Sequence, residues 1–370
     1  MRPFLSLIIL ASLLIFPACE NNDDDGTGGG GSDNFDRAAM LVSWADQLIL
    51  PAYADFLVTA DELQNSAQAL FDNPDATTFA ALKVDFEAAY LSWQSISVFQ
   101  IGPAEALGLR EQINAYPTDA TGIEANLNGS YNLDLPSERS RQGFPALDYL
   151  LYGAAADETA ILARIENEQG FREYVLAVAE RISALVSSVQ QQWLEGYRDE
   201  FVSQSGNSAT ASVDRLVNDY VFYYEKFLRA GKVGIPAGIF SGAPLPTHVE
   251  ALYNRALGKQ LLLAALDATQ NFFNGQRRGE TPTSNGLSDY LDFLNTVKDG
   301  ADLSQLIDDQ FDAARTAIDR LNDDLSQQVE EDNSLMLMAY DELQRNVVLI
   351  KLDMLQALNI NVDFVDADGD

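Results

Sequence analysis

Cysteine and histidine are almost absent from this chain, and their scarcity excludes several kinds of site. The 370 residues contain one cysteine, Cys19, and one histidine, His248. One chain can therefore form no internal disulfide and no structural zinc site built from several Cys and His ligands. An HExxH zinc-peptidase motif, which needs two histidines, is excluded as well. A Ser-His-Asp triad would have to use His248, and no Gly-x-Ser-x-Gly nucleophile elbow is present.

Basic residues are also few. Lys and Arg total 23 against 56 Asp and Glu, which gives a formal net charge of −33. Such a chain offers no positive field to displace the counterions of phosphates, so nucleic acid is not an expected partner. The charge favours cations or basic partners; alternatively, the acids only keep solvated helix faces soluble. Hydrophobic residues make up 47% of the chain, which is enough for a large core.

The N-terminus carries an export signal. Arg2 precedes an apolar run, residues 5–16, that is too short to span a bilayer as a helix. Phe16-Pro17-Ala18-Cys19 then resembles the cleavage box of a lipoprotein, with a small residue before the cysteine. We expect residues 1–18 to be a lipoprotein signal peptide and Cys19 to carry the lipid anchor. The alternative is an ordinary signal peptide followed by a chance cysteine.

The remainder predicts an all-α protein made of two packed helical bundles. An acidic and Gly-rich tether, residues 19–34, cannot pack. Amphipathic helical patterns then recur, and no alternating run is long enough to demand a sheet. The predicted helices cover residues 35–73 (kinked or split at Pro51), 78–99, 168–204, 213–229, 249–273, 287–297, 303–329 and 335–358. A turn at 204–208 divides an N-terminal bundle (35–205) from a C-terminal bundle (206–358), and an acidic tail (359–370) follows.

Asp148 is the most unusual ionisable residue in the sequence. It lies within the apolar stripe of a short helix that begins near Gly143 and Pro145 and ends near Gly153. A carboxylate in that position is costly unless it is paired, protonated or bound to a cation. Three more acids, Glu105, Asp119 and Glu124, lie on the irregular stretch 103–142 and could converge on it. Together the four carboxylates predict a site for a hard cation. The alternative is that Asp148 pairs with an arginine or caps a loop.

The same stretch resembles the signature of the imelysin-like family, Gly-x-His-x-x-Glu followed by an apolar run. Gly143 matches the glycine, Asp148 stands at the Glu position, and Pro145 stands at the His position. Further stretches match the family in the same order, including those that contain Trp93, Tyr116 and Lys232. The resemblance covers roughly residues 36 to 370, and it makes these residues candidates to line the cleft between the bundles.

The resemblance implies several functions. Iron-regulated members suggest a lipid-anchored accessory or binding protein in iron or haem acquisition, which acts with uptake partner proteins and holds iron or another divalent cation. The founding activity suggests a metallopeptidase instead, and a structural component of an envelope complex is a third alternative. Because Pro145 has no ligand atom, we expect a non-catalytic protein. Its expected place is the cell envelope, anchored through Cys19 in the outer membrane and facing the periplasm or the surface.

Overall fold

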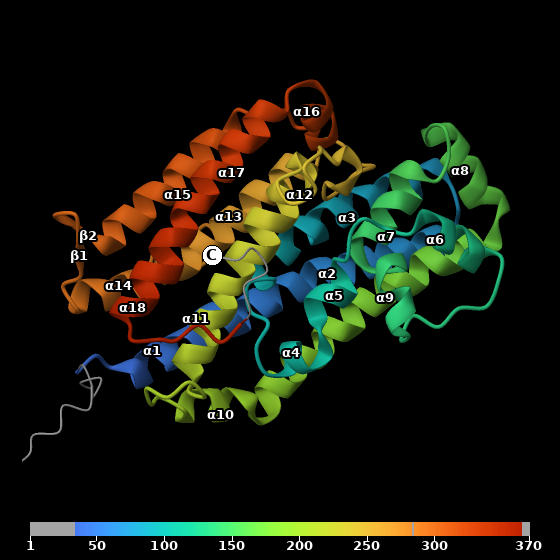
Figure 1. Ribbon diagram of the computed structural model, residues 1–370. Helices are drawn as coiled ribbons and strands as arrows, with labels where there is room; N and C mark the ends of the chain where they lie inside the picture. Colours follow the sequence, from blue (N-terminus) through green and yellow to red (C-terminus); the bar gives the residue numbers. More distant parts are fainter. Residues whose placement is uncertain (1–33, 283–284, 365–370) are drawn as a thin grey trace, which may run out of the picture. The chain divides into compact units, whose positions relative to one another are not determined.

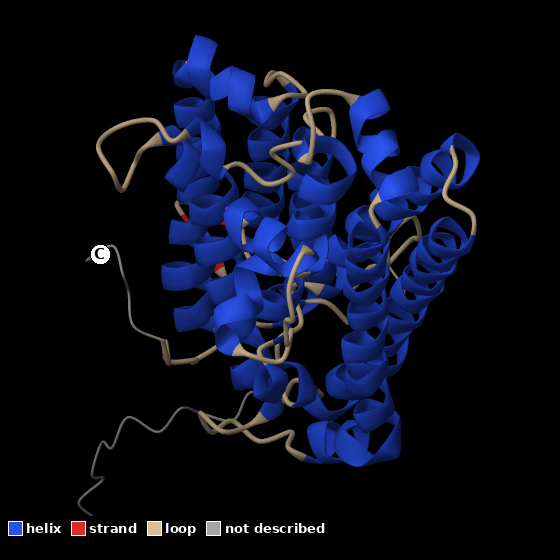
Figure 2. Cartoon of the chain, turned by 90° about the vertical axis from the view of Figure 1, so that its right-hand side faces the viewer, coloured by secondary structure: helices blue, strands red, loops and turns tan. Residues whose placement is uncertain are grey.

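Helices make up nearly all of the regular structure in the computed structural model, which describes residues 34–282 and 285–364 (Figure 2). The all-α prediction is confirmed. Within the described ranges the strands form one small antiparallel pair, β1 (Val297–Lys298) and β2 (Ala301–Asp302). Residues 1–33, 283–284 and 365–370 lie outside the described part. With them lie Cys19, the predicted signal peptide, nearly all of the predicted tether and the last six residues of the predicted tail.

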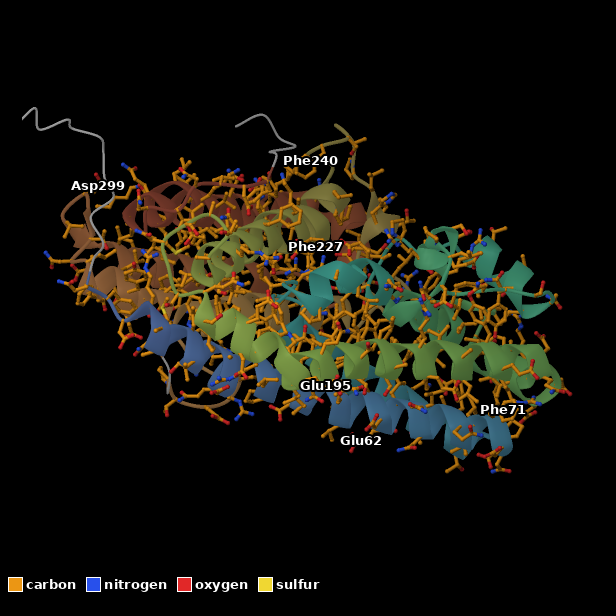
Figure 3. The ribbon with its side chains drawn as sticks, turned by 90° about the horizontal axis from the view of Figure 1, so that it is seen from below. Glu62, Phe71, Glu195, Phe227, Phe240 and Asp299 are labelled. Atoms are coloured by element: carbon orange, nitrogen blue, oxygen red, sulfur yellow. The ribbon has the colours of Figure 1, made fainter. Side chains whose placement is uncertain are left out.

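The first group of packed helices consists of α2 (Leu50–Asp72), α3 (Ala76–Ile96) and α9 (Gln169–Gln192) (Figure 1). On α2, Phe56, Leu63 and Leu70 recur at heptad spacing and are fully buried, so one stripe of the helix faces its neighbours. Burying each of these side chains is worth about 1.5–3 kcal/mol. The opposite face carries exposed residues such as Glu62, and α2 runs beside α9 along much of its length (Figure 3).

The second group consists of α13 (Gly258–Phe273), α15 (Leu303–Asp319), α17 (Asn333–Val347) and the π-helical segment Tyr223–Gly234. Helix α13 packs against α15 and the π-helical segment and also against α3, so it joins the two groups (Figure 1). Residues 34–282 and 285–364 accordingly belong to one compact unit. The predicted bundle boundary at residue 205 stays a prediction.

The other elements are short. The α-helices are α1 (Arg37–Ser43), α4 (Pro103–Leu107), α5 (Leu109–Ile113), α6 (Ala120–Leu127), α7 (Gly143–Asp148), α8 (Glu158–Asn167), α10 (Arg198–Ser203), α11 (Ser212–Phe222), α12 (Ile235–Ala237), α14 (Leu287–Phe293), α16 (Leu325–Glu331) and α18 (Leu355–Ala357). The remaining π-helical segments are Trp44–Ile49, Tyr149–Gly153, Trp193–Tyr197 and Val348–Met354, and two 3₁₀ segments are Pro136–Arg141 and Pro246–His248.

Pro51 does not split the first helical run. A wider π-helical turn, Trp44–Ile49, leads directly into α2, and Pro51 occupies the first turn of α2. Local widening of this kind is one way for a helix to continue past a residue that lacks an N–H. The next helix, α3, is capped by Asp75, whose Oδ1 accepts from the backbone N–H groups of Thr77 and Thr78. The cap residue therefore lies two residues before Thr77 and three before Thr78, either of which could have capped the helix by its residue type.

Other boundaries also differ from the sequence-based expectation; for example, the helix predicted over 303–329 is divided into α15 and α16. The stretch 103–142, expected to be irregular, contains α4, α5, α6 and a 3₁₀ turn. Residues 230–246, expected to be a loop, continue as helix to Ala237. Residues 249–257, expected to be helical, are irregular, and α13 begins only at Gly258. No helix among the described residues is long and apolar enough to cross a membrane.

Candidate functional site

Helix α7 is held tightly against the end of α5, and Gly143 makes this possible. Gly143 has φ of +72°, and a Cβ added there would lie 2.1 Å from the carbonyl oxygen of Ile113. Only glycine meets both constraints. Every residue of α7 is buried, and the ring of Phe144 stacks on Tyr90 with the centroids 4.5 Å apart. The motif helix is therefore a core element of the first group.

Asp148, the last residue of α7, is buried as predicted, with 2% of its surface exposed. Its Oδ2 accepts from the backbone N–H of Tyr253 at 2.9 Å, and its Oδ1 accepts from that of Asn254 at 2.7 Å. Burial raises the pKa of Asp148 to about 7, although the two N–H donors act in the opposite direction. The partners of this carboxylate are thus two backbone groups and not an arginine. It fastens the irregular segment 249–257 to α7.

A second buried carboxylate, Glu250, lies in that fastened segment. Its Oε2 pairs with the ammonium of Lys232, and both side chains are at least 96% buried. Its Oε1 accepts from Asn114 Nδ2 at 2.7 Å and from Gln94 Nε2 at 3.3 Å. Burial lowers the pKa of Lys232, and the charge of Glu250 opposes that shift. The pair is a charge-neutral unit whose polar atoms are largely occupied.

The candidate cleft residues Trp93, Tyr116 and Lys232 do meet in space. They line a cavity of about 20 Å³, large enough for one water molecule. Trp93 Nε1 and Gln94 Oε1 are buried there without a hydrogen-bond partner among the described residues. Burial and then the charge of Glu250 raise the pKa of Tyr116 well above its usual value. Two of the residues around the cavity thus keep one unused donor and one unused acceptor.

An outer ring of polar contacts closes the cluster. Tyr90 donates to Asn114 Oδ1 at 2.7 Å. Glu87 Oε1 accepts from Tyr152 at 2.9 Å and from Asn254 Nδ2 at 2.8 Å. These partners, like Glu250 and Gln94, were missed as site residues from the sequence. The sequence contains one indication of these polar contacts, because Gln94 is a polar residue within the buried stripe of α3.

The other predicted carboxylates lie elsewhere in separate ion pairs. Glu105 pairs with Arg215 (2.6 Å), Asp119 with Arg141 (2.8 Å) and Glu124 with Arg164 (2.8 Å). In the part of the chain that the structure describes, no three His, Cys, Asp or Glu residues come close enough to hold a metal. These three acids consequently do not form the expected cluster with Asp148, and metal binding by any of the four stays a prediction.

A family model described as imelysin matches residues 49–347, most of the chain. The chain belongs to the imelysin family. Iron-regulated protein A of Synechococcus elongatus is 22% identical over 287 residues, which cover 74% of this chain and 73% of the relative.

Two solved structures share the fold. One is an imelysin-like protein from Psychrobacter arcticum, with a TM-score of 0.69 and 19% identity, covering 89% of this chain and 97% of its own. The other is a putative iron-regulated protein A precursor from Parabacteroides distasonis, with a TM-score of 0.69 and 17% identity, covering 87% and 96%. The imelysin fold predicted from the sequence is thus shown.

Within the imelysin family signature, this chain keeps the glycine and an acid but not the histidine. Pro145, at the histidine position, is buried in α7 and has no side-chain ligand atom. Asp148, at the acid position, gives both oxygens to backbone N–H groups. The site therefore holds its polar groups by internal hydrogen bonds and one ion pair.

Proposed function

We propose that this imelysin family member is an exported, lipid-anchored accessory protein of iron or haem acquisition that does not act as a peptidase. The observation that carries the non-catalytic part is the bonding of Asp148. A catalytic metal needs about three protein ligands and an open position for water. Here both oxygens of the motif acid are occupied by backbone donors, and the adjacent Glu250 is neutralised by Lys232.

The iron-related part of the proposal rests on relatives. One curated relative and one solved structure carry the name iron-regulated protein A, the latter as a precursor. The residues at the motif do not form an open ligand set for iron, because the oxygens of Asp148 and Glu250 already bind other groups. A partner protein of the uptake system would then supply the iron- or haem-binding step, and this chain would support it.

We expect the purified protein to show no metal-dependent proteolysis. Pro145 cannot bind a metal, and a general base would have to come from the occupied Asp148 or Glu250. The measurement is cleavage of unfolded casein with and without a chelator, after incubation with Fe²⁺, Zn²⁺ or Ca²⁺. Chelator-sensitive cleavage that disappears in Asp148→Asn would contradict the proposal. An Asp199→Asn variant, changed at an exposed aspartate of α10, serves as the control.

We expect Cys19 to anchor the mature protein. Cys19→Ser should move the protein from the membrane fraction to the soluble fraction, because the acyl chains provide the stable membrane attachment. Mass spectrometry of the wild-type N-terminus should show a lipid-modified cysteine. Thr27→Ser, a matched change within the tether, should leave the protein in the membrane. If Cys19→Ser stays in the membrane fraction too, the anchor is not at this residue.

A further inference from the structure

A second cavity lies on the face of α3 opposite the ion pair between Lys232 and Glu250. It has no role in the proposed function. It has a volume of about 150 Å³ and lies among the start of α2, the C-terminal end of α3 and the C-terminal half of α13. Its apolar wall is formed by Leu48, Ala52, Phe99, Ala268 and Phe272. A cavity of about this size can hold a molecule with the volume of benzene.

Polar groups occupy one part of the wall. Ser92 and Ser95 are three residues apart on α3 and so share a face. Neither hydroxyl has a hydrogen-bond partner among the described residues, and both side chains are only half-buried. The cavity therefore presents two free hydroxyls next to an apolar floor.

Two arginines stand at the cavity, and they differ in their partners. Arg277 pairs with Asp55 at 2.7 Å and with Glu280 at 3.0 Å. Arg278 also lines the cavity, is exposed, and forms no ion pair with any described residue. The lining residues thus carry one net positive charge in a chain whose formal charge is −33.

We propose that this cavity binds a small carboxylate with an apolar body, such as an aromatic or short-chain organic acid. The body packs against the rings of Phe99 and Phe272, which contact each other edge to face with their centroids 5.5 Å apart, and it leaves water there. The carboxylate faces Arg278 and the hydroxyls of Ser92 and Ser95, which donate charge-assisted hydrogen bonds to it. The proposal concerns a site separate from Asp148 and does not depend on the iron-related function.

One local effect opposes this assignment and makes the test sharp. Helix α13 ends at Phe273, and its C-terminal end carries a partial negative charge that favours cations. A neutral or cationic ligand of the same shape is therefore the proper competitor. Benzoate, benzyl alcohol and benzylamine share the ring and differ mainly in the charge of the polar group.

The experiment measures the binding of these three compounds to the full chain carrying Cys19→Ser, by isothermal titration or ligand-observed NMR. Benzoate should bind about tenfold more tightly than benzyl alcohol, the value of one charge-assisted hydrogen bond. Arg278→Gln should remove that advantage and leave benzyl alcohol unaffected. Ala268→Leu should abolish binding of both, because it fills the cavity. Arg320→Gln, an exposed arginine at the end of α15, should change nothing.

Equal binding of the three compounds, or tightest binding of benzylamine, would overturn the proposal. So would benzoate binding that survives Ala268→Leu, since the ligand would then lie elsewhere. Thermal unfolding of each variant checks that it is folded. If Ala268→Leu does not fold, Ala52→Leu fills the same space from α2 and gives the same test.

Discussion

Glu250→Gln is expected to lower the free energy of unfolding by about 3–5 kcal/mol, the usual cost of breaking a buried ion pair. The reason is that Lys232, whose side chain is 4% exposed, would be left with a charge and no counterion. Chemical denaturation at pH 7 measures the loss. Lys232→Met should cost a similar amount, because it leaves Glu250 as the uncompensated charge.

The double variant separates this explanation from a general packing defect. Lys232→Met combined with Glu250→Gln removes both charges, so it should recover most of the stability that either single change loses. Glu158→Gln is the matched control. Its pair with Lys83 spans 2.9 Å, but Glu158 is 69% exposed, so the expected loss is below about 1 kcal/mol. A Glu250→Gln loss no larger than the control, or a double variant as unstable as the singles, would show that the pair does not stabilise the fold.

The second large effect is a dependence of stability on pH that comes from Asp148. Its pKa is raised from an ordinary 3.8 to about 7 by burial, so between these values the folded protein keeps a proton that the unfolded chain releases. Raising the pH through this window therefore favours unfolding. The contribution reaches about 1.4 kcal/mol per pH unit at its steepest. It is fully present below pH 4 and lost by pH 7 to 8.

Asp148→Asn removes this titration. The unfolding free energy of the wild type minus that of the variant should be largest near pH 4 and below, where Asp148 is protonated in the folded and the unfolded state. There the variant also loses about 1–3 kcal/mol, because its amide N–H₂ faces one of the two backbone donors. The difference should fall by about 1.4 kcal/mol per pH unit above pH 4 and change sign before pH 8, where the wild type carries a buried charge. Asp199→Asn, at a position that is 84% exposed, should give a difference that does not change with pH. If the difference for Asp148→Asn does not change with pH, the pKa of Asp148 in the folded protein is not raised.

Much of the fold could be predicted because helical periodicity is a local signal. The apolar stripes of α2, α3, α9 and α17 were identified from spacing alone. The burial of Asp148 followed from the same reasoning, because an acid within an apolar stripe lies on the face of the helix that packs against the core. The resemblance to the imelysin family added the order of the motifs and placed Trp93, Tyr116 and Lys232 at one site.

What the sequence did not indicate depends on partners far along the chain. Residues 249–257 have the composition of a helix, but Asp148 binds the backbone N–H groups of Tyr253 and Asn254 and holds them out of helical geometry. Likewise, each of the three acids on the stretch 103–142 forms an ion pair with an arginine and does not lie beside Asp148. The acids are Glu105, Asp119 and Glu124. The partners lie 110, 22 and 40 residues away along the chain, so nothing in the spacing favours them over the motif acid.

The sequence separation within the site has a consequence for how the protein must be made and handled. Asp148 and Asn254 are 106 residues apart, and Gln94 and Glu250 are 156 apart. Contacts of this range form only after a large loop has closed, so they contribute late and slow the overall folding. A nascent chain that has emerged only to residue 205 exposes Asp148, Gln94 and Asn114 without their partners. The site is therefore complete only when residues before and after this position have folded together, and we expect neither part to substitute for the whole chain in the laboratory.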